Sequence, residues 1–365
     1  MEDFDLAIVG ASFAGLLCAR AAAARGLRTI ILESKRHPAA RVHTTGILVK
    51  EAGEEIDTPP HLTRTIHAVR LYAPNLASID LTAPGYYFLT TDTAGLLAWL
   101  TEEATKSGAE IRCGTRIDQA TRDGDRILLP QPGVRAGYLV GADGARSTVA
   151  RLFGLGRNTQ FLLGLEREYP NLPDADANFL HCFLDSRLAR GYLAWVAPAP
   201  GFTQVGLATS GSAKPDLQAF LDHTEPIFGY SRAAISERRS GLIPCGGPVS
   251  PAGAPGVMLI GDAAGHVSPM TGGGIRLAFR YGRRAGQLIH DHLTRGGPRP
   301  DLALAGELPS FTLKLAMRRV MDLGPPNWLF NAVIATPMMR WVARRIYFHR
   351  RVQPGFEAPP PSPGA

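Results

Sequence analysis

A short glycine-rich segment near the N-terminus has the residue types that bind phosphate. GASFAG, residues 10–15, keeps the first and last glycines of the G-x-G-x-x-G pattern, and Ser12 replaces the middle one. A small residue there lets a phosphate approach the backbone, and the hydroxyl of Ser12 adds a donor. The free N–H groups of a helix beginning here would face a pyrophosphate. We therefore expect a dinucleotide site containing Gly10, Ser12, Phe13, Ala14 and Gly15.

The elements that must position this segment form a βαβ unit. Residues 4–9 predict a buried strand, residues 13–24 predict a helix that Gly26 ends, and residues 27–32 predict the next strand. Glu33 closes that second strand, where its carboxylate accepts hydrogen bonds from ribose hydroxyls and disfavours a 2′-phosphate. Ser34 beside it belongs to the same expected site. The pattern alone does not separate NAD from FAD.

Two later segments extend the pattern. GADGARS, residues 141–147, places Asp143 at a turn before a predicted helix, and Gly261-Asp262 follows the buried strand VMLI. A carboxylate at the end of a strand, such as Asp262, is placed to bond a ribityl hydroxyl. The order of the three motifs resembles the p-hydroxybenzoate-hydroxylase-like superfamily of single-Rossmann flavoproteins, over about residues 1–300. The resemblance implies FAD as the cofactor.

The block GDAAGHVSPMTGGGIRLAFRYG, residues 261–282, is similar to the geranylgeranyl reductase family, whose members carry GDAAG, a proline and then TGGGI entering a helix. Gly272, Gly273 and Gly274 would let the backbone lie against the isoalloxazine ring, and the helix beginning at Ile275 would stabilise negative charge on the reduced flavin. The resemblance also implies a flavin contact at Arg41, and Ile117 is included in the expected site. In RVHTTGIL, Thr44 or Thr45 stands where archaeal members have a cysteine.

Two aromatic residues are the expected substrate contacts. GYLAWVAP, residues 191–198, is similar to the Tyr-x-Trp strand that lines the substrate cavity of this family. Tyr192 and Trp195 are one residue further apart than usual, and an extra residue in a strand turns one side chain to the other face. An alternative is that both are core aromatics of a sheet.

The C-terminal part carries the basic excess of a chain whose net charge is +7. Residues 317–351 hold seven arginines and one acid, and residues 327–348 add tryptophan, tyrosine and other apolar side chains. Such a segment suits an anionic membrane surface, and Pro337 is expected to divide it into two short helices. The alternative is a helical pair that roofs the cavity, and the two interpretations are compatible.

Composition narrows the class of protein. No apolar run approaches the roughly 18 residues of a membrane-spanning helix, and the acidic N-terminus does not predict a signal peptide. Four cysteines lack any C-x-x-C pairing, which favours reduced thiols and predicts no metal site. We expect a cytoplasmic protein, peripheral on a membrane if the basic segment binds one, with a hydrophobic small-molecule substrate and no nucleic-acid partner.

The predicted fold class is α/β, with a Rossmann-type FAD domain interleaved with an antiparallel-sheet substrate domain and followed by a C-terminal helical segment. The FAD domain is expected to be discontinuous and the last residues, PPPSPGA, to end a disordered tail. The expected boundaries are 1–66, 92–157 and 240–297 for the FAD domain, 67–91 and 158–239 for the sheet domain, 298–352 for the helices and 353–365 for the tail.

The favoured function is reduction of C=C bonds in an isoprenoid or other hydrophobic substrate, with hydride from reduced flavin N5 and a proton from a side chain or water. Thr45, His43 and His266 are the candidate proton donors. No second G-x-G-x-x-G occurs between residues 150 and 250, so NAD(P)H would bind transiently or another carrier would supply electrons. The alternatives are a flavin monooxygenase of an aromatic or polyketide substrate, and a redox-neutral cyclase or isomerase.

Overall fold

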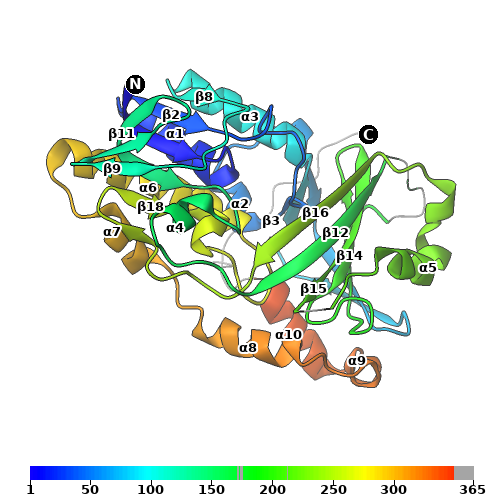
Figure 1. Cartoon of the computed structure of the whole chain (residues 1–365). Helices are drawn as coiled ribbons and strands as arrows, with labels where there is room; N and C mark the ends of the chain where they lie inside the picture. The colour runs from blue at the N-terminus through cyan, green and yellow to red at the C-terminus, as the bar shows by residue number, and fades with distance from the viewer. Residues whose placement is uncertain (171, 173–175, 212, 349–365) are drawn as a thin grey trace.

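The computed structural model describes residues 1–348 except 171, 173–175 and 212. Two regions lie side by side in Figure 1: a parallel sheet with helices on the side of the N-terminus, and a second, curved sheet opposite. The predicted α/β fold class, with a Rossmann-type unit, antiparallel strands and C-terminal helices, is confirmed. The division into domains stays a prediction.

The first sheet contains the βαβ unit expected from the sequence. Its parallel strands are ordered β18-β11-β1-β2-β8, and the short strand β17 pairs antiparallel to β18. Strands β9 and β10 extend antiparallel from β11. The bounds are β1 Glu2–Val9, β2 Thr29–Leu32, β8 Glu110–Arg112, β9 Thr121–Asp123, β10 Arg126–Leu129, β11 Val134–Gly141, β17 Gly253–Ala254 and β18 Val257–Leu259.

Helices cover this sheet and share its core. Helix α1 packs against both α3 and α6, and Leu16 of α1 and Phe279 of α6 are buried in the same apolar cluster. The start of α3 at Thr93 and of α6 at Ile275 agree with the sequence patterns, although α6 continues five residues beyond His290. The bounds are α1 Phe13–Ala23, α3 Thr93–Lys106, α4 Thr148–Leu152 and α6 Ile275–Arg295, with the 3-10 turn η3 at Gly261–Ala264.

The second sheet is ordered β16-β12-β15-β14-β13-β5-β6. Its neighbours are antiparallel except β5 and β13, which are parallel. The expected antiparallel sheet is confirmed, and the parallel pairing of β5 with β13 is possible because a long stretch of chain, rather than a hairpin, joins these two strands. The bounds are β5 Ala68–Tyr72, β6 Ser78–Thr82, β12 Phe161–Tyr169, β13 Phe179–Phe183, β14 Ala194–Ala199, β15 Phe202–Ser210 and β16 Glu237–Pro244.

Several short elements differ from the sequence expectations. Residues 36–60, expected to be a loop, contain β3 and α2, and the strand expected at 86–89 is shifted to β7. Three-residue β3 is too short to show a period, and its partner β7 is far away in sequence. These elements are β3 Ile47–Val49, α2 Lys50–Gly53, η1 Pro60–Leu62, β4 Thr63–Ile66, β7 Phe88–Thr91, α5 Leu217–Phe228 and η2 Tyr230–Arg232.

The C-terminal helices run along the lower edge of the molecule in Figure 1. They are α7 Pro300–Glu307, α8 Thr312–Asp322, α9 Asn327–Val333 and α10 Pro337–Tyr347. Pro337 occupies the first turn of α10, so the predicted break into two short helices is confirmed. Helix α10 packs against β6, and its Ala343 is buried with the core of the second sheet. The predicted tail at 353–365 lies outside the described residues.

Candidate active site

A cavity of about 1040 Å³ lies between the two sheets. Residues of the first glycine-rich turn, the 271–275 segment, the second sheet and α10 all line it. This volume is at the upper end of the usual range for ligand sites. The region expected to hold the dinucleotide and the region expected to hold the substrate therefore form one continuous space.

The glycine-rich turn presents backbone N–H groups and one hydroxyl to this cavity. Strand β1 ends at Val9, and Ser12 caps α1 by accepting a hydrogen bond from the Gly15 amide at 3.3 Å. Because the oxygen acts there as the acceptor, the Ser12 hydroxyl keeps its proton for a ligand. Gly15 does not line the cavity, but a Cβ on it would overlap the carbonyl oxygen of Gly10. The turn therefore fits a pyrophosphate at the start of α1.

Glu33 is held at the cavity wall by the backbone around it. Its Oε2 accepts from the Ala11 amide and its Oε1 from the Lys35 amide, both at 2.8 Å. The Ser34 hydroxyl donates to the same Oε1 at 3.2 Å. These bonds fix the carboxylate at the end of β2 and leave lone pairs for ribose hydroxyls.

The two predicted aspartates differ in what their carboxylates do. Asp143 accepts from the Ser147 hydroxyl and the Thr148 amide, both at 2.6 Å, and so caps α4. Asp262 has no hydrogen bond to its carboxylate from the described residues, and burial raises its pKa to about 6. Both line the cavity. Asp262 is the one with free acceptors, and this fits a ribityl chain of the predicted FAD, whereas Asp143 mainly shapes the wall.

The TGGG segment is held from the substrate side. The Tyr192 hydroxyl donates to the Thr271 carbonyl, and a Cβ on Gly272, whose φ is +62°, would lie 2.8 Å from that hydroxyl. Helix α6 then begins at Ile275 without a side-chain cap, so its first N–H groups have no intrahelical partner. Gly272, Gly273, Gly274 and Ile275 all line the cavity. A flat ring lying here would meet bare backbone and the positive end of a helix.

The remaining predicted cofactor and proton-donor residues divide into two groups. Ile117, His43 and Thr45 line the cavity, whereas Arg41 and His266 are not among its lining residues. Arg41 is exposed. His266 is buried against Tyr281 with ring centroids 5.6 Å apart, and burial lowers its pKa to about 4. His266 is thus a neutral core residue, as isolated histidines often are.

The substrate side is apolar. Trp195 on β14 lines the cavity, and so does Tyr192, although β14 begins only at Ala194. Tyr192 lies in the turn before the strand, where its amide donates to the Ala189 carbonyl. The expectation that spacing within one strand turns one aromatic away is therefore wrong. The other apolar lining residues include Leu71, Phe88, Leu180, Cys182, Leu193, Met321, Met339, Val342, Ala343, Ile346 and Tyr347.

Sequence reasoning missed two sets of lining residues. Helix α10 contributes Met339, Val342 and Ile346 to the cavity, which supports the roof interpretation of this segment. Strand β12 contributes Glu166, and β16 contributes Arg239. The signal for Glu166 was present: acids at 166 and 168 alternate with other residues, so both side chains share one face of a strand.

Comparisons with known proteins agree with this geometry. The model of the FAD binding domain family matches residues 3–204. Digeranylgeranylglycerophospholipid reductase 3 of Methanosphaera stadtmanae is 30% identical, over 79% of this chain and 77% of its own length. Menaquinone reductase of Mycolicibacterium smegmatis is 28% identical, over 80% of this chain and 77% of its own. A geranylgeranyl bacteriochlorophyll reductase-like protein of Thermoplasma acidophilum shares the fold, with a TM-score of 0.82, 21% identity and coverage of 95% and 97%.

Proposed function

Since the chain belongs to the geranylgeranyl reductase family of FAD-dependent oxidoreductases, we propose that it reduces C=C bonds in the isoprenoid chain of a lipid. Its substrate is a hydrophobic small molecule. The observation that carries the proposal is the continuity of the cavity. One space joins the glycine-built wall to an apolar wall made by the second sheet and α10. An extended prenyl chain matches that lining.

Different residues of the chain would hold different parts of the FAD molecule. Ser12 and the start of α1 would bind the pyrophosphate, Glu33 would bind ribose hydroxyls and Asp262 would bind the ribityl chain. The first turn of α6 stabilises negative charge beside Gly274. When bound, reduced FAD supplies the hydride.

The apolar wall positions the alkene and keeps water away from it. An unactivated alkene is a poor hydride acceptor, so it must be held at a fixed distance in a space without competing water. Trp195, Val342 and Ile346 exclude water and align the chain, while Thr45 and His43 are the polar groups of the sequence prediction that reach the same space. The electron donor is NAD(P)H bound transiently or a separate carrier.

We further propose that the protein docks on an anionic membrane through α8–α10. No helix in the described part of the chain has the length and apolar character to cross a bilayer. However, Trp328, Met338 and Trp341 are exposed, and Arg344 and Arg345 of α10 are exposed as well, with the Arg345 guanidinium 4.4 Å from the Trp341 ring centroid. Aromatic and basic side chains together suit the headgroup region. The inner face of the same α10 lines the cavity, so a lipid could enter without crossing water.

Anaerobic incubation of the chemically reduced protein with prenyl lipids, followed by mass spectrometry, tests the reductase function. We expect a gain of two hydrogens for each double bond lost. An unchanged mass with rearranged double bonds would identify an isomerase or cyclase. A product that gains oxygen, and forms only in air from an aromatic substrate, would identify a monooxygenase.

A further inference from the structure

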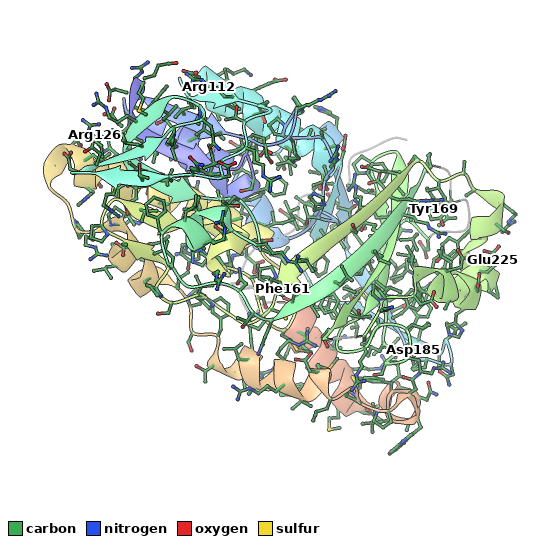
Figure 2. All side chains as sticks on the ribbon, viewed as in Figure 1. Arg112, Arg126, Phe161, Tyr169, Asp185 and Glu225 are labelled. Carbon is green, nitrogen blue, oxygen red and sulfur yellow. The ribbon has the colours of Figure 1, made fainter. Side chains whose placement is uncertain are left out.

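Four charged residues form a ladder on one face of strands β12 and β16. In the antiparallel register Glu166 lies opposite Arg239, and Glu168 lies opposite Glu237. Residues two apart in a strand share a face, so all four side chains point to the same side. The two ends of β12 are labelled Phe161 and Tyr169 in Figure 2, and the two glutamates lie between them.

The ladder holds more negative than positive charge. Arg239 Nη2 lies 2.6 Å from Glu168 and 2.8 Å from Glu237, and its Nη1 lies 3.7 Å from Glu166. In the part of the chain that the structure describes, no other cation lies within ion-pair distance of these three carboxylates. The side chains of Arg239, Glu166 and Glu168 are 4%, 5% and 7% exposed. Three ionised carboxylates around one buried guanidinium would be costly, so the group retains a proton.

The electrostatic surroundings favour the protonated forms of both buried acids. Burial raises the pKa of the Glu166 carboxyl, against the opposing effects of Thr45, Arg239 and Trp195. Burial also raises the pKa of Glu168 to about 7, which is near neutrality. A raised pKa keeps a carboxyl group protonated at a higher pH, which is the form that a general acid needs.

Glu166 occupies the end of the ladder that reaches the cavity. It lines the cavity together with Thr45 and Trp195. Its Oε2 accepts from the Trp195 indole N–H at 3.0 Å, which fixes the orientation of the carboxyl group. Its Oε1 is buried, lies 3.7 Å from Arg239 Nη1 and has no hydrogen-bond partner among the described residues. A buried polar atom without a partner needs an explanation, and a role toward a bound molecule is one.

The opposite end of the ladder reaches solvent. The Glu237 side chain is 39% exposed, and Arg239 bridges it to Glu168. His43 lies near this wall, where its Nδ1 is 2.8 Å from the Ser240 carbonyl oxygen. Arg239 therefore contacts all three carboxyl groups, those of Glu237 at the solvent, Glu168, and Glu166 at the cavity.

We propose that Glu166 is the acid that protonates the substrate carbon, and that Glu237 and Glu168 resupply its proton from solvent. This inference rests on the proposed alkene reduction. The π bond breaks as hydride from the reduced flavin forms a C–H bond at one carbon. The Glu166 O–H bond breaks and its proton forms the C–H bond at the other carbon, leaving a carboxylate. Glu168 then returns a proton to Glu166, so each double bond consumes one hydride and one proton from solvent.

Trp195 acts as a positioning residue in this scheme, because its indole N–H donates to Oε2 and so fixes the orientation of the carboxyl group. Thr45, in the segment before β3, also borders the carboxyl group. Neither group needs to exchange a proton with the substrate.

The first test is independent of activity. Infrared titration of the oxidised, FAD-loaded protein should show a protonated carboxyl signal at neutral pH. That signal should be lost or shifted in Glu166→Gln and kept in Glu102→Gln, a matched change at an exposed site on α3. A wild-type protein without this signal, or a signal that Glu166→Gln leaves unaltered, would overturn the proposal even if no alkene substrate were found.

The second test is anaerobic single turnover of the reduced protein with a prenyl lipid. Glu166→Gln should slow product formation by roughly 10²–10⁴-fold with unchanged flavin content and lipid binding, and Glu166→Asp should restore part of the rate. Turnover of Glu166→Gln at the wild-type rate would remove Glu166 as the donor and leave the reductase function intact. If the wild-type protein reduces no alkene, the proposed function fails, and the infrared result still decides whether Glu166 carries the proton.

Discussion

The two walls of the cavity are built in different ways. The wall that receives FAD consists largely of backbone: the turn at Gly10–Gly15, the TGGG segment and the free N–H groups of α1 and α6. The wall that receives the substrate consists of side chains from the second sheet and α10, which are brought together from distant parts of the chain. The first wall recognises groups common to every FAD molecule, and the second must match the shape of a hydrophobic substrate.

This difference predicts different responses to substitution. A backbone wall has no room for an added carbon where the backbone packs against itself, as it does at Gly10 and Gly15. A side-chain wall can change its shape while the strands behind it keep their hydrogen bonds. Changes on the FAD side should therefore abolish cofactor binding, whereas changes on the substrate side should leave FAD bound and alter substrate use.

The largest effect is expected from Gly15→Ala. The added Cβ would overlap the Gly10 carbonyl oxygen and press on Ala142, so the turn could not keep its shape. We expect a protein that is purified without flavin and has a lower melting temperature, as measured by the flavin absorbance ratio and calorimetry.

Gly306→Ala is the matched control for that substitution. Gly306 lies within α7, and a Cβ added there would meet no other atom within 4 Å, so alanine should be neutral or stabilising by roughly 0.5–1 kcal/mol. A Gly15→Ala protein that retained a full complement of FAD would contradict the backbone account of this wall.

The next effect is expected from Asp262→Asn. The folded pKa of about 6 is above the usual value near 3.8, so the folded apoprotein binds more protons than the unfolded chain between these pH values. Stability from this group is fully present below about pH 4 and is lost as the pH rises through 6. The neutral amide should therefore stabilise the apoprotein by roughly 3 kcal/mol at pH 7.5, have little effect at pH 4, and weaken FAD binding.

Denaturant unfolding of the two apoproteins at both pH values, with flavin titration, measures this prediction. A difference in unfolding free energy that is the same at pH 4 and 7.5 would show that Asp262 does not carry the buried charge.

A moderate effect is expected from Val342→Phe in α10. The phenyl ring would occupy part of the apolar space that Val342 lines, leaving less room for the substrate. We expect about a tenfold rise in KM for a long prenyl chain, in the range for occluding part of a hydrophobic pocket, with normal FAD content. Leu302→Phe, at an exposed position on α7, is the control and should change neither quantity. Loss of FAD in Val342→Phe would mean that the two walls are not independent.

The smallest effect is expected from Arg344→Ala on the outer face of α10. One basic residue near an anionic surface contributes about 1 kcal/mol to membrane binding. Sedimentation with vesicles containing anionic lipid should therefore show roughly fivefold weaker binding, and the loss should shrink as salt is added. Arg25→Ala, an exposed arginine after α1, should bind vesicles like wild type. Equal binding by both variants would contradict the membrane proposal, but it would not change the finding that α10 lines the cavity.

The same contrast explains what could be predicted from sequence. The FAD wall is encoded in contiguous segments. GASFAG with Glu33 predicted the βαβ unit, and TGGG before Ile275 predicted further residues that line the cavity. The motif could not distinguish two uses of an aspartate: Asp143 binds the start of α4, and Asp262 has free acceptors. That distinction depends on where neighbouring amides point.

The substrate wall was harder to predict, because its members come together only after folding. Glu166 meets Trp195 across the sheet and Arg239 on a neighbouring strand, and none of these pairings follows from local spacing. The parallel pairing of β5 with β13 depends on the route of the chain between them. His266 was selected for its place in a motif, but tertiary packing buried it away from the cavity.

The most direct test of the proposed alkene reduction is the ratio of flavin reoxidised to double bonds lost. The reduced, FAD-loaded protein is mixed anaerobically with a prenyl lipid, flavin reoxidation is followed by absorbance, and the double bonds lost are counted by mass spectrometry. We expect one flavin to be reoxidised for each double bond reduced. Product formation while the flavin stays reduced, or reoxidation that requires oxygen, would contradict it.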